Sequence, residues 1–282
     1  MQDAPHILVI SMASSMERRT LQAYQLQRLG LSFEFMDATT AGDIPDEEMK
    51  RLQRRWARRL RDTEVSCALS HRKAWGIVAK APRPMLVIED DVILSTDIAT
   101  VLTAAATLSD VDCVNLETFG APKTLGRPRA LAQAGYTVAE VFRDSAGAAA
   151  YLLWPQGAQK LLTSLSMMLP LADAAINLAP NLRKLQIEPA AAIQVSILNK
   201  SEPISHPVRR SLIATSRKTK ERPPLAEWLG YKIRRVRVSA IVLTQNIRSL
   251  GRSRRIIVDY ADTNNALALL KEAFPELTNP PT

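Results

Sequence analysis

Three consecutive acids, Glu89-Asp90-Asp91, are the part of the sequence with the clearest capacity for chemistry. They follow Met85 to Ile88, an apolar run that predicts a short buried strand. Open α/β sheets bind ligands at the carboxyl ends of their strands. Because clustered carboxylates raise one another's pKa unless a cation joins them, a hard divalent metal is their natural counter-ion. On spacing alone, a solvated acidic turn that caps the next element is about equally compatible with this run.

Two other segments carry residues suited to a site. Ser15-Met-Glu-Arg-Arg19 directly follows the first predicted strand, so a helix N-terminus and guanidinium groups could hold phosphate there. His71 lies in a predicted helix and shares a face with Cys67, Ala74 and Trp75. A lone histidine in a helix is more often a packing residue than a catalyst, and arginine is common at helix starts. Neither segment identifies a site by itself.

The elements that position these residues alternate between strands and helices. Hydrophobic patterns predict strands at 6–12, 32–36, 85–88, 92–94, 112–117, 136–142, 148–154, 185–188 and 192–197. Helices are predicted at 14–29, 46–61, 64–80, 97–108, 155–166 and 171–178. This alternation predicts an α/β fold with an open, mostly parallel sheet of the Rossmann type and helices on both faces. Residues 119–135 carry Gly, Pro and basic residues and predict a mobile loop, which could be a lid that orders when a donor binds.

Composition narrows the class of protein. A chain of 282 residues with 46% hydrophobic content can bury a large core, and we expect one main domain. Cys67 and Cys113 fall in segments that read as buried, which favours free thiols in a reducing compartment. The first apolar run is too short for a signal peptide, and no stretch approaches the roughly 20 apolar residues needed to span a bilayer. We therefore expect a soluble, cytoplasmic protein.

The net charge of +9 is concentrated in residues 209–255. Nucleic acid, anionic lipid headgroups or a phosphorylated glycolipid would all suit such a region, but no aromatic-rich motif or zinc finger supports nucleic acid. We predict a catalytic domain at 1–204 and a basic, helical extension at 205–282. Residues 228–250 mix Arg with Ile, Val and Leu, so a helix there could pack on the core or lie on a membrane.

The order of these motifs resembles that of glycosyltransferase family 25, which includes lipooligosaccharide and collagen-type galactosyltransferases. The first strand is followed by S-x-x-R-R, then by LGLSFEFMDA from Leu29 and by EVSCALSHRKAW from Glu64. The acidic motif VIEDDV and the later segment AYLLWPQGAQKLL, from Ala150, complete the series. The resemblance covers about residues 6–200.

The resemblance implies a GT-A-like fold, a UDP-sugar donor such as UDP-galactose or UDP-glucose, and an inverting transfer that uses Mn²⁺ or Mg²⁺. Carried over by motif, the implied residues fall into three groups. Glu89 and Asp91 would bind metal; Ser15, Arg18, Ser70, Glu89 and Asp90 would bind the donor; and His71 and Asp173 would act in catalysis, Asp173 as the general base.

Two departures from the family pattern stand out. Ser11-Met12 replaces the usual Asn-Leu after the first strand, and the P-x-D segment reads Pro-Leu-Ala-Asp with no second acid beside Asp173. Glu188, at a predicted strand end, is a fallback base. We expect transfer of a hexose to a lipopolysaccharide or lipooligosaccharide acceptor, a glycolipid or its oligosaccharide, at the cytoplasmic face of the membrane. The alternative is a non-catalytic protein of the same fold that binds nucleotide sugars or glycans.

Overall fold

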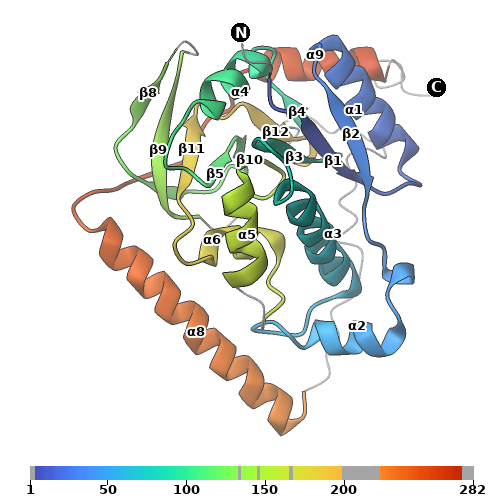
Figure 1. Cartoon of the computed structure of the whole chain (residues 1–282), viewed down its shortest axis with the longest axis vertical. Coiled ribbons are helices and arrows are strands. Elements are labelled where there is room, and N and C mark those ends of the chain that lie inside the picture. The colour runs from blue at the N-terminus through green and yellow to red at the C-terminus, as the bar shows by residue number, and fades with distance from the viewer. Residues whose placement is uncertain (1–3, 133–134, 145–146, 165–167, 199–222, 275–282) are drawn as a thin grey trace, which may run out of the picture.

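A central sheet with helices on both faces dominates the computed structural model, which describes residues 4–132, 135–144, 147–164, 168–198 and 223–274 (Figure 1). The strands of the two sheets in the described residues are β1 (Ile7–Ser11), β2 (Phe33–Asp37), β3 (Met85–Glu89), β4 (Val92–Leu94), β5 (Cys113–Asn115), β6 (Glu117–Thr118), β7 (Lys123–Leu125), β8 (Arg129–Leu131), β9 (Tyr136–Arg143), β10 (Ala150–Leu153), β11 (Lys184–Glu188), β12 (Ala192–Gln194) and β13 (Arg254–Ile256). The helices of the described residues are α1 (Met16–Arg28), a 3₁₀ turn (Ala41–Asp43), α2 (Asp46–Gln53), α3 (Asp62–Val78), α4 (Ile98–Ala106), α5 (Pro155–Ser164), α6 (Ala172–Leu178), α7 (Val195–Leu198), α8 (Leu225–Ser249) and α9 (Thr263–Ala273).

The main sheet has the strand order β13-β7-β9-β11-β5-β10-β3-β1-β2, with β8 paired to β9. β2, β1 and β3 are parallel neighbours, as are β5 and β11, whereas β10 runs antiparallel between β3 and β5. β7, β8 and β9 also pair in antiparallel fashion. Parallel pairs need a crossover helix, and none lies in the described residues between β6 and β10. The predicted α/β fold with helices on both faces is confirmed, and its sheet is mixed.

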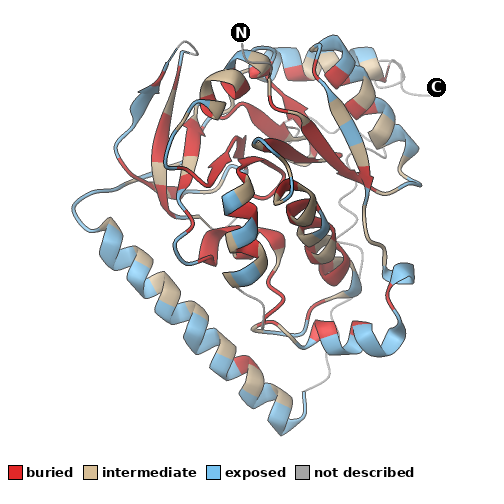
Figure 2. Cartoon of the chain, viewed as in Figure 1, coloured by how far each residue is buried: buried red, intermediate tan, exposed pale blue. Residues whose placement is uncertain are grey.

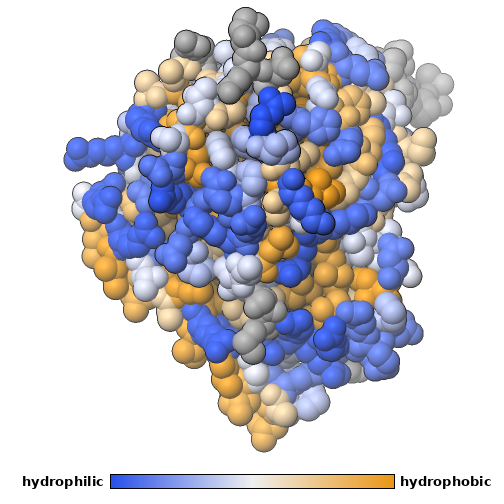
Figure 3. Space-filling model, in the orientation of Figure 1, coloured by the Kyte–Doolittle hydropathy of each residue, from blue (hydrophilic) through white to orange (hydrophobic). Residues whose placement is uncertain are grey.

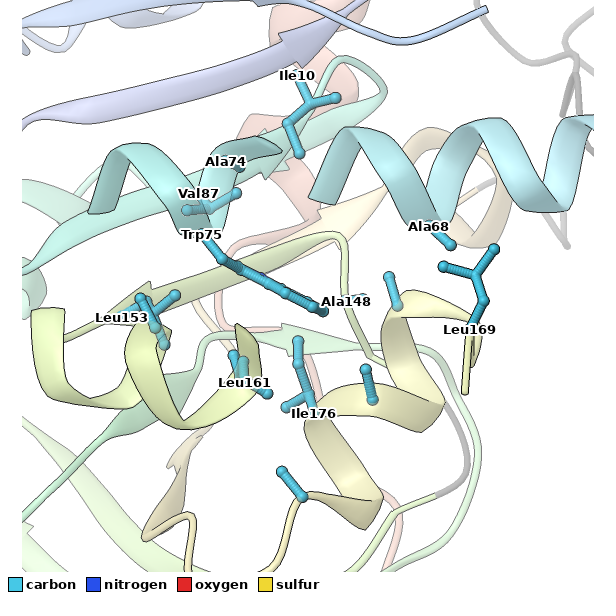
Figure 4. Close-up of a cluster of buried hydrophobic side chains, with 14 of the residues drawn as sticks. Ile10, Ala68, Ala74, Trp75, Val87, Ala148, Leu153, Leu161, Leu169 and Ile176 are labelled. Carbon is cyan, nitrogen blue, oxygen red and sulfur yellow. The ribbon is translucent and has the colours of Figure 1, made fainter. Parts of the chain in front are cut away.

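Side chains alternate between the two faces of the sheet and fill two cores. On one face, residues of β1, β3 and β10 pack under α3, α5 and α6, with Trp75, Leu161 and Ile176 at the centre (Figures 2 and 4). On the other face, the intervening residues of the same strands pack under α1 and α4. Each buried Leu, Ile or Phe contributes roughly 1.5–3 kcal/mol, so both layers hold the carboxyl edge of the sheet in place.

A smaller sheet, β4-β12-β6, lies beside this edge. α1 is fastened to it by two buried amides: Gln22 donates to the Val92 carbonyl (2.8 Å), and Gln25 accepts from the Leu94 N–H (2.7 Å). In β12, Gln194 pairs with Val92, one residue after the acidic run. The small sheet therefore brings a polar side chain from late in the chain next to Glu89-Asp90-Asp91.

Three predicted elements are corrected by the structure. The helix predicted at 46–61 ends at Gln53, because Trp56 and Leu60 then turn into the core and are buried. The predicted loop at 119–135 contains β7 and β8, since its Gly and Pro residues mark turns between short strands. The strand predicted at 192–197 stops at Gln194, where α7 begins. A lid function for 119–135 stays a hypothesis.

The C-terminal region contributes to the main body of the protein. α8 packs on the core through Val238, Ile241 and Val242, and the side chain of Tyr231 is buried. β13 pairs with β7 at the edge of the main sheet, and α9 packs against α1. The predicted boundary between residues 204 and 205 lies outside the described residues. Within the described chain, none of the helices combines the length and hydrophobicity that crossing a membrane requires.

Candidate active site

The acidic run lies at the carboxyl edge of the parallel strands β1 and β3. Glu89 is the last residue of β3 and pairs in register with Ile10, while Asp90 and Asp91 form the turn that leads into β4. Ser11, the last residue of β1, stands beside them. The predicted position at a strand end is therefore the observed one, and the N-terminus of α1 faces the same edge.

Asp90 is buried and accepts hydrogen bonds from side chains of β1 and α1. Its carboxylate accepts hydrogen bonds from the Ser11 hydroxyl and from Arg18 Nη1, both at 2.7 Å. Its backbone carbonyl accepts from Gln22 at 3.2 Å. Burial lowers the pKa of Arg18, but the charges of Asp91 and Asp90 outweigh that effect and raise it. Asp90 thus ties β1 and α1 to the acidic turn, and Ser11 serves this contact.

Glu89 is oriented by a chain of buried side chains. His71 Nε2 lies 3.1 Å from Glu89 Oε1, and His71 Nδ1 lies 2.9 Å from the Tyr151 hydroxyl. That hydroxyl also accepts a hydrogen bond from Trp75 Nε1 at 2.9 Å. Burial raises the pKa of Tyr151 well above its ordinary value, so the phenol stays neutral. His71 is fully buried, whereas 24% of the Glu89 side chain is exposed, so Glu89 is the member of this chain that reaches solvent.

Asp91 is buried, and its contact with Arg18 is longer than that of Asp90. It is 8% exposed and lies 3.8 Å from Arg18 Nη1, and its Oδ1 accepts a hydrogen bond from Gln194 Nε2 at 3.2 Å. Burial raises its pKa to about 7, and the negative charge of Glu89 adds to that shift. The same Gln194 nitrogen lies 3.5 Å from Glu89 Oε2. Glu89 and Asp91 therefore face one point, where positive charge would relieve their repulsion.

This arrangement fits a hard divalent cation. Glu89 and Asp91 offer carboxylate oxygens, the ligands preferred by Mg²⁺ and Mn²⁺. Burial first and the charge of Glu89 second raise the pKa of Asp91, and a bound cation would oppose both effects. A second group of possible ligand atoms, from Cys67, His71 and Glu89, lies within 4.8 Å of one another. Thiol and imidazole ligands favour softer ions. Both cysteines are free thiols, and burial raises the pKa of Cys67 well above its ordinary value.

The two predicted donor-binding serines differ in their surroundings. Ser70 is buried; its hydroxyl donates to the Ser66 carbonyl (2.8 Å) and accepts from the Thr39 N–H (2.9 Å). It fastens the segment after β2 to α3 and has no described contact with the acids. Ser15 occupies the N-cap position of α1, is partly exposed and makes no side-chain capping bond. Of the two, Ser15 is the hydroxyl placed to meet a ligand at the helix N-terminus.

The two candidate bases, Asp173 and Glu188, also have different surroundings. Asp173, in the first turn of α6, accepts from the Ala174 N–H at 2.6 Å. Burial raises its pKa, and the charge of Glu89 adds to this shift, which places Asp173 within electrostatic range of the acidic run. Glu188 ends β11 and forms an ion pair with Arg254 on β13. Asp173 is therefore near enough to Glu89 to feel its charge, whereas Glu188 is held in its ion pair with Arg254.

Sequence reasoning missed Glu117, a buried acid after β5. Burial raises its pKa to about 8 against the lowering effect of Lys123. Its Oε1 accepts from the Ala149 N–H at 2.6 Å, and the Ala149 carbonyl accepts from the Glu89 N–H at 2.8 Å. Its Oε2 has no hydrogen-bond partner among the described residues. The backbone N–H and carbonyl of Ala149 thus join Glu117 to Glu89. An acid at the end of the predicted strand 112–117 was the available signal.

Glu117 belongs to a cluster of buried polar side chains, and the backbone at Gly147 passes close to this cluster. Lys123 pairs with Asp144 at 2.8 Å, and both side chains are buried. Gly147 has φ +115°, and a Cβ there would lie 2.5 Å from the side-chain nitrogen of Asn115. This backbone conformation favours glycine, and it lets the chain at Gly147 lie close over the side chains of Asn115 and Glu117.

Comparisons with known proteins identify the family of the chain. Residues 4–176 match the sequence model of glycosyltransferase family 25, described as LPS biosynthesis proteins. A Haemophilus influenzae protein named "Putative glycosyltransferase" is 28% identical over 164 residues, which cover 56% of this chain and 57% of that protein. The present chain thus spans little more than half the length of this relative. Because the family match covers most of the chain and includes the acidic run and α3, the protein belongs to glycosyltransferase family 25.

Proposed function

We propose that the protein transfers a hexose, galactose or glucose, from a UDP-sugar to a lipopolysaccharide-type acceptor, with inversion at the anomeric carbon. The observation that carries this proposal is the meeting of Glu89 and Asp91 at one point beside the N-terminus of α1. A sugar diphosphate needs a cation and hydrogen-bond donors at one place, and two carboxylates that would hold a cation lie at this edge of the sheet beside a helix N-terminus. Membership of a lipopolysaccharide biosynthesis family supports the class of acceptor.

Each residue of the edge has a distinct part in this proposal. Glu89 and Asp91 would hold Mn²⁺ or Mg²⁺, which supplies charge neutralisation of the diphosphate leaving group when bound. Ser15 and the first turn of α1 would contact phosphate or ribose. Asp90 holds Arg18 at the rim through their 2.7 Å contact, and His71 fixes the carboxylate of Glu89.

Asp173 is the proposed general base. In an inverting transfer the acceptor oxygen bonds to the anomeric carbon as the bond to the diphosphate breaks, and the hydroxyl proton passes to a carboxylate. UDP leaves with the bonding electrons. Burial raises the pKa of Asp173 and so brings it nearer to neutral pH, where a carboxylate is a more effective base.

The first experiment is release of UDP from a panel of UDP-sugars, with Mn²⁺ or with EDTA, in the presence of lipooligosaccharide acceptors. We expect metal-dependent release from one donor, and a loss of at least about 100-fold in Asp91→Asn. Asp46→Asn, an exposed acid at the start of α2, is the matched control and should behave as wild type. Absence of release from every donor, with UDP binding retained in calorimetry, would favour the non-catalytic binding protein.

A peripheral position at the cytoplasmic face of the membrane is also part of the proposal. The face of α8 opposite its core contacts carries exposed apolar residues at helical intervals: Leu225, Leu229, Val236, Leu243, Ile247 and Leu250. Figure 3 shows hydrophobic residues along the lower left edge, where Figure 1 places α8. Lys232 and Arg237, both exposed, lie beside this outer stripe. An anionic membrane suits such a face, because each basic residue near the surface adds about 1 kcal/mol.

A further inference from the structure

A groove of about 1150 Å³ separates α8 from the antiparallel part of the main sheet. Its walls come from β9, the start of β11, the turn after α6, and the inner flank of α8 with the residues that follow it. β11 runs parallel to β5, and β10 is antiparallel to both β5 and β3. Lys184 at the start of β11 therefore lies at the edge of the sheet opposite Glu89. The groove is separate from the acidic site.

The lining of this groove is strongly basic. It holds seven cationic side chains, Arg127, Arg129, Lys160, Arg183, Lys184, Arg248 and Arg252, and two acidic ones, Asp110 and Glu140. Three of the cations are neutralised: Arg183 pairs with Asp110, Arg248 with Glu140, and Lys160 with Asp112 outside the lining. Seven less three leaves four cations, Arg127, Arg129, Lys184 and Arg252, without a carboxylate partner in the described residues.

Lys184 is the most informative of these four because it is buried. It is 8% exposed, and its ammonium donates to the Asn177 carbonyl at 2.9 Å. Burial lowers its pKa to about 8, the direction expected when no anion compensates the charge. An uncompensated buried ammonium is unfavourable, and an anionic ligand in the groove would remove that cost. Arg252, whose guanidinium lies 5.8 Å from the centre of the Phe142 ring, adds a second donor.

The size of the groove and its polar lining suit a saccharide, and its basic charge suits phosphate groups on that saccharide. The volume is that of a site for a molecule much larger than inorganic phosphate. Thr244, Gln245 and Asn181 line the same groove and can hydrogen-bond sugar hydroxyls. α6 connects the two sites: Asp173 lies in its first turn, and Asn177, the partner of Lys184, lies near its end. At 1.5 Å per residue, this helix spans roughly 10 Å, a distance that a short oligosaccharide covers.

We propose that the groove binds phosphate groups on the acceptor saccharide, at a distance from the point of sugar transfer. This inference rests on the proposed function for the identity of the saccharide, but its ligand chemistry follows from the groove. α8 forms one wall, and its outer stripe is the surface proposed to lie on the membrane. A phosphorylated glycolipid would therefore meet its binding groove beside the bilayer that carries it.

Binding without turnover tests this inference. The probes are the phosphorylated oligosaccharide from delipidated lipopolysaccharide and the same oligosaccharide after enzymatic dephosphorylation, both titrated by calorimetry without a UDP-sugar. We expect wild type to prefer the phosphorylated form. In the double variant Arg129→Glu/Arg252→Glu its Kd should rise by at least about tenfold, since two charge-assisted contacts are reversed. Arg83→Glu, an exposed arginine outside the groove, is the control and should bind as wild type.

Several outcomes would overturn the inference. These are equal binding of the two oligosaccharides by wild type, unchanged binding by the double variant, or tighter binding of an RNA oligonucleotide than of the phosphorylated saccharide. UDP release in the absence of acceptor should be the same in the double variant and wild type, because neither arginine lies at the acidic site. If wild type releases no UDP but discriminates between the oligosaccharides, the proposed function fails and the groove stands.

Discussion

Asp90 and Asp91 are neighbours in sequence and have opposite electrostatic situations. Asp90 has two donors at 2.7 Å, so its charge is compensated within the protein. Asp91 has only a 3.2 Å contact with Gln194 and a more distant Arg18, and burial raises its pKa to about 7. The paired carboxylate links β1, α1 and the acidic turn, and the less compensated one is the proposed cation ligand. The run of acids in the sequence cannot distinguish these roles, because Ser11 and Gln194 are distant along the chain.

At the same scale, Tyr151 is expected to be a positioning residue. Tyr151→Phe leaves His71 Nδ1 and Trp75 Nε1 without their shared partner, so we expect a loss of about 1–3 kcal/mol in the free energy of unfolding. Glu89 would also lose its fixed orientation, and kcat for UDP release should fall by about tenfold with little change in KM. Urea unfolding and steady-state kinetics measure the two effects. Tyr24→Phe, on the exposed side of α1, is the control, and equal kinetics in both variants would contradict the positioning role.

Glu117 makes stability depend on pH. Burial raises its pKa from 4.5 to about 8, so the folded state holds a proton that the unfolded state releases. Its contribution to stability is therefore complete below pH 4.5 and is lost as pH rises through 8. Between pH 5.5 and 8.5 we expect wild type to lose about 3 kcal/mol more than Glu117→Gln, as measured by urea unfolding. Asp46→Asn, at an exposed position at the start of α2, should keep the wild-type slope. Parallel slopes in all three proteins would contradict this assignment.

At the scale of elements, strand positions could be predicted but strand directions could not. Hydrophobic runs located β1, β3, β5 and β10, because buried strands are continuous apolar segments. Nothing in such a run fixes whether its neighbour is parallel. β10 enters the sheet between β3 and β5 in the antiparallel direction, and this arrangement places the segment around Ala149 between Glu89 and Glu117. The acidic run was therefore predictable, whereas the link from Glu117 to Glu89 through Ala149 was not.

For helix α8 the sequence predicted the helix but not which of its faces packs on the core. The sequence left open whether residues 228–250 pack on the core or lie on a membrane. The structure shows core contacts by Val238, Ile241 and Val242 and an exposed apolar stripe on the other side. The two uses are compatible because they involve opposite faces. A helical wheel reveals two apolar stripes, but only the fold assigns one of them to the core.

A vesicle experiment tests the outer stripe. Leu243 and Ile247 are 59% and 58% exposed, and burial of each in a bilayer interface would contribute roughly 2 kcal/mol. We expect Leu243→Glu/Ile247→Glu to reduce cosedimentation with phosphatidylglycerol vesicles by at least about tenfold. Ala226→Glu adds one such negative charge on a flank of α8, outside the stripe, and should reduce binding by much less than half of the effect of the double variant. Wild-type binding that is equal with neutral phosphatidylcholine vesicles would rule out the contribution of the basic flanks.

Across the whole molecule, opposite charges gather at opposite edges of one sheet. The carboxyl edge carries Glu89 and Asp91, and the amino edge of β11 carries the basic groove around Lys184. The net charge of +9 gives no indication of this separation. Its concentration in residues 209–255 directed attention to α8 but not to Arg127 or Arg129, which reach the groove from the other wall. Long-range charge organisation depends on topology, which composition does not contain.

The last consequence concerns the integrity of the fold. β13 extends the main sheet through β7, and α9 buries Ala266 and Leu270 in a cluster with Leu21, Ile93 and Ile193. Truncation after Arg252 would remove both elements and expose the side of α1 that packs against α9. Arg18, which contacts Asp90, lies on the same helix. Loss of several buried side chains corresponds to about 5 kcal/mol, so we expect Tm to fall by at least about 10 °C.

Differential scanning calorimetry of the truncated chain measures this loss of stability. A chain that ends at Phe274 retains β13 and α9 and is the control; it should melt within a few degrees of the full chain. Calorimetric titration with UDP distinguishes lost stability from a lost site. Because Arg18 and the start of α1 stand on the helix that α9 supports, the truncated chain should also bind UDP more weakly. Unchanged Tm and UDP affinity would mean that α9 is peripheral to the fold, and the C-terminal region would then be an appendage of the catalytic domain.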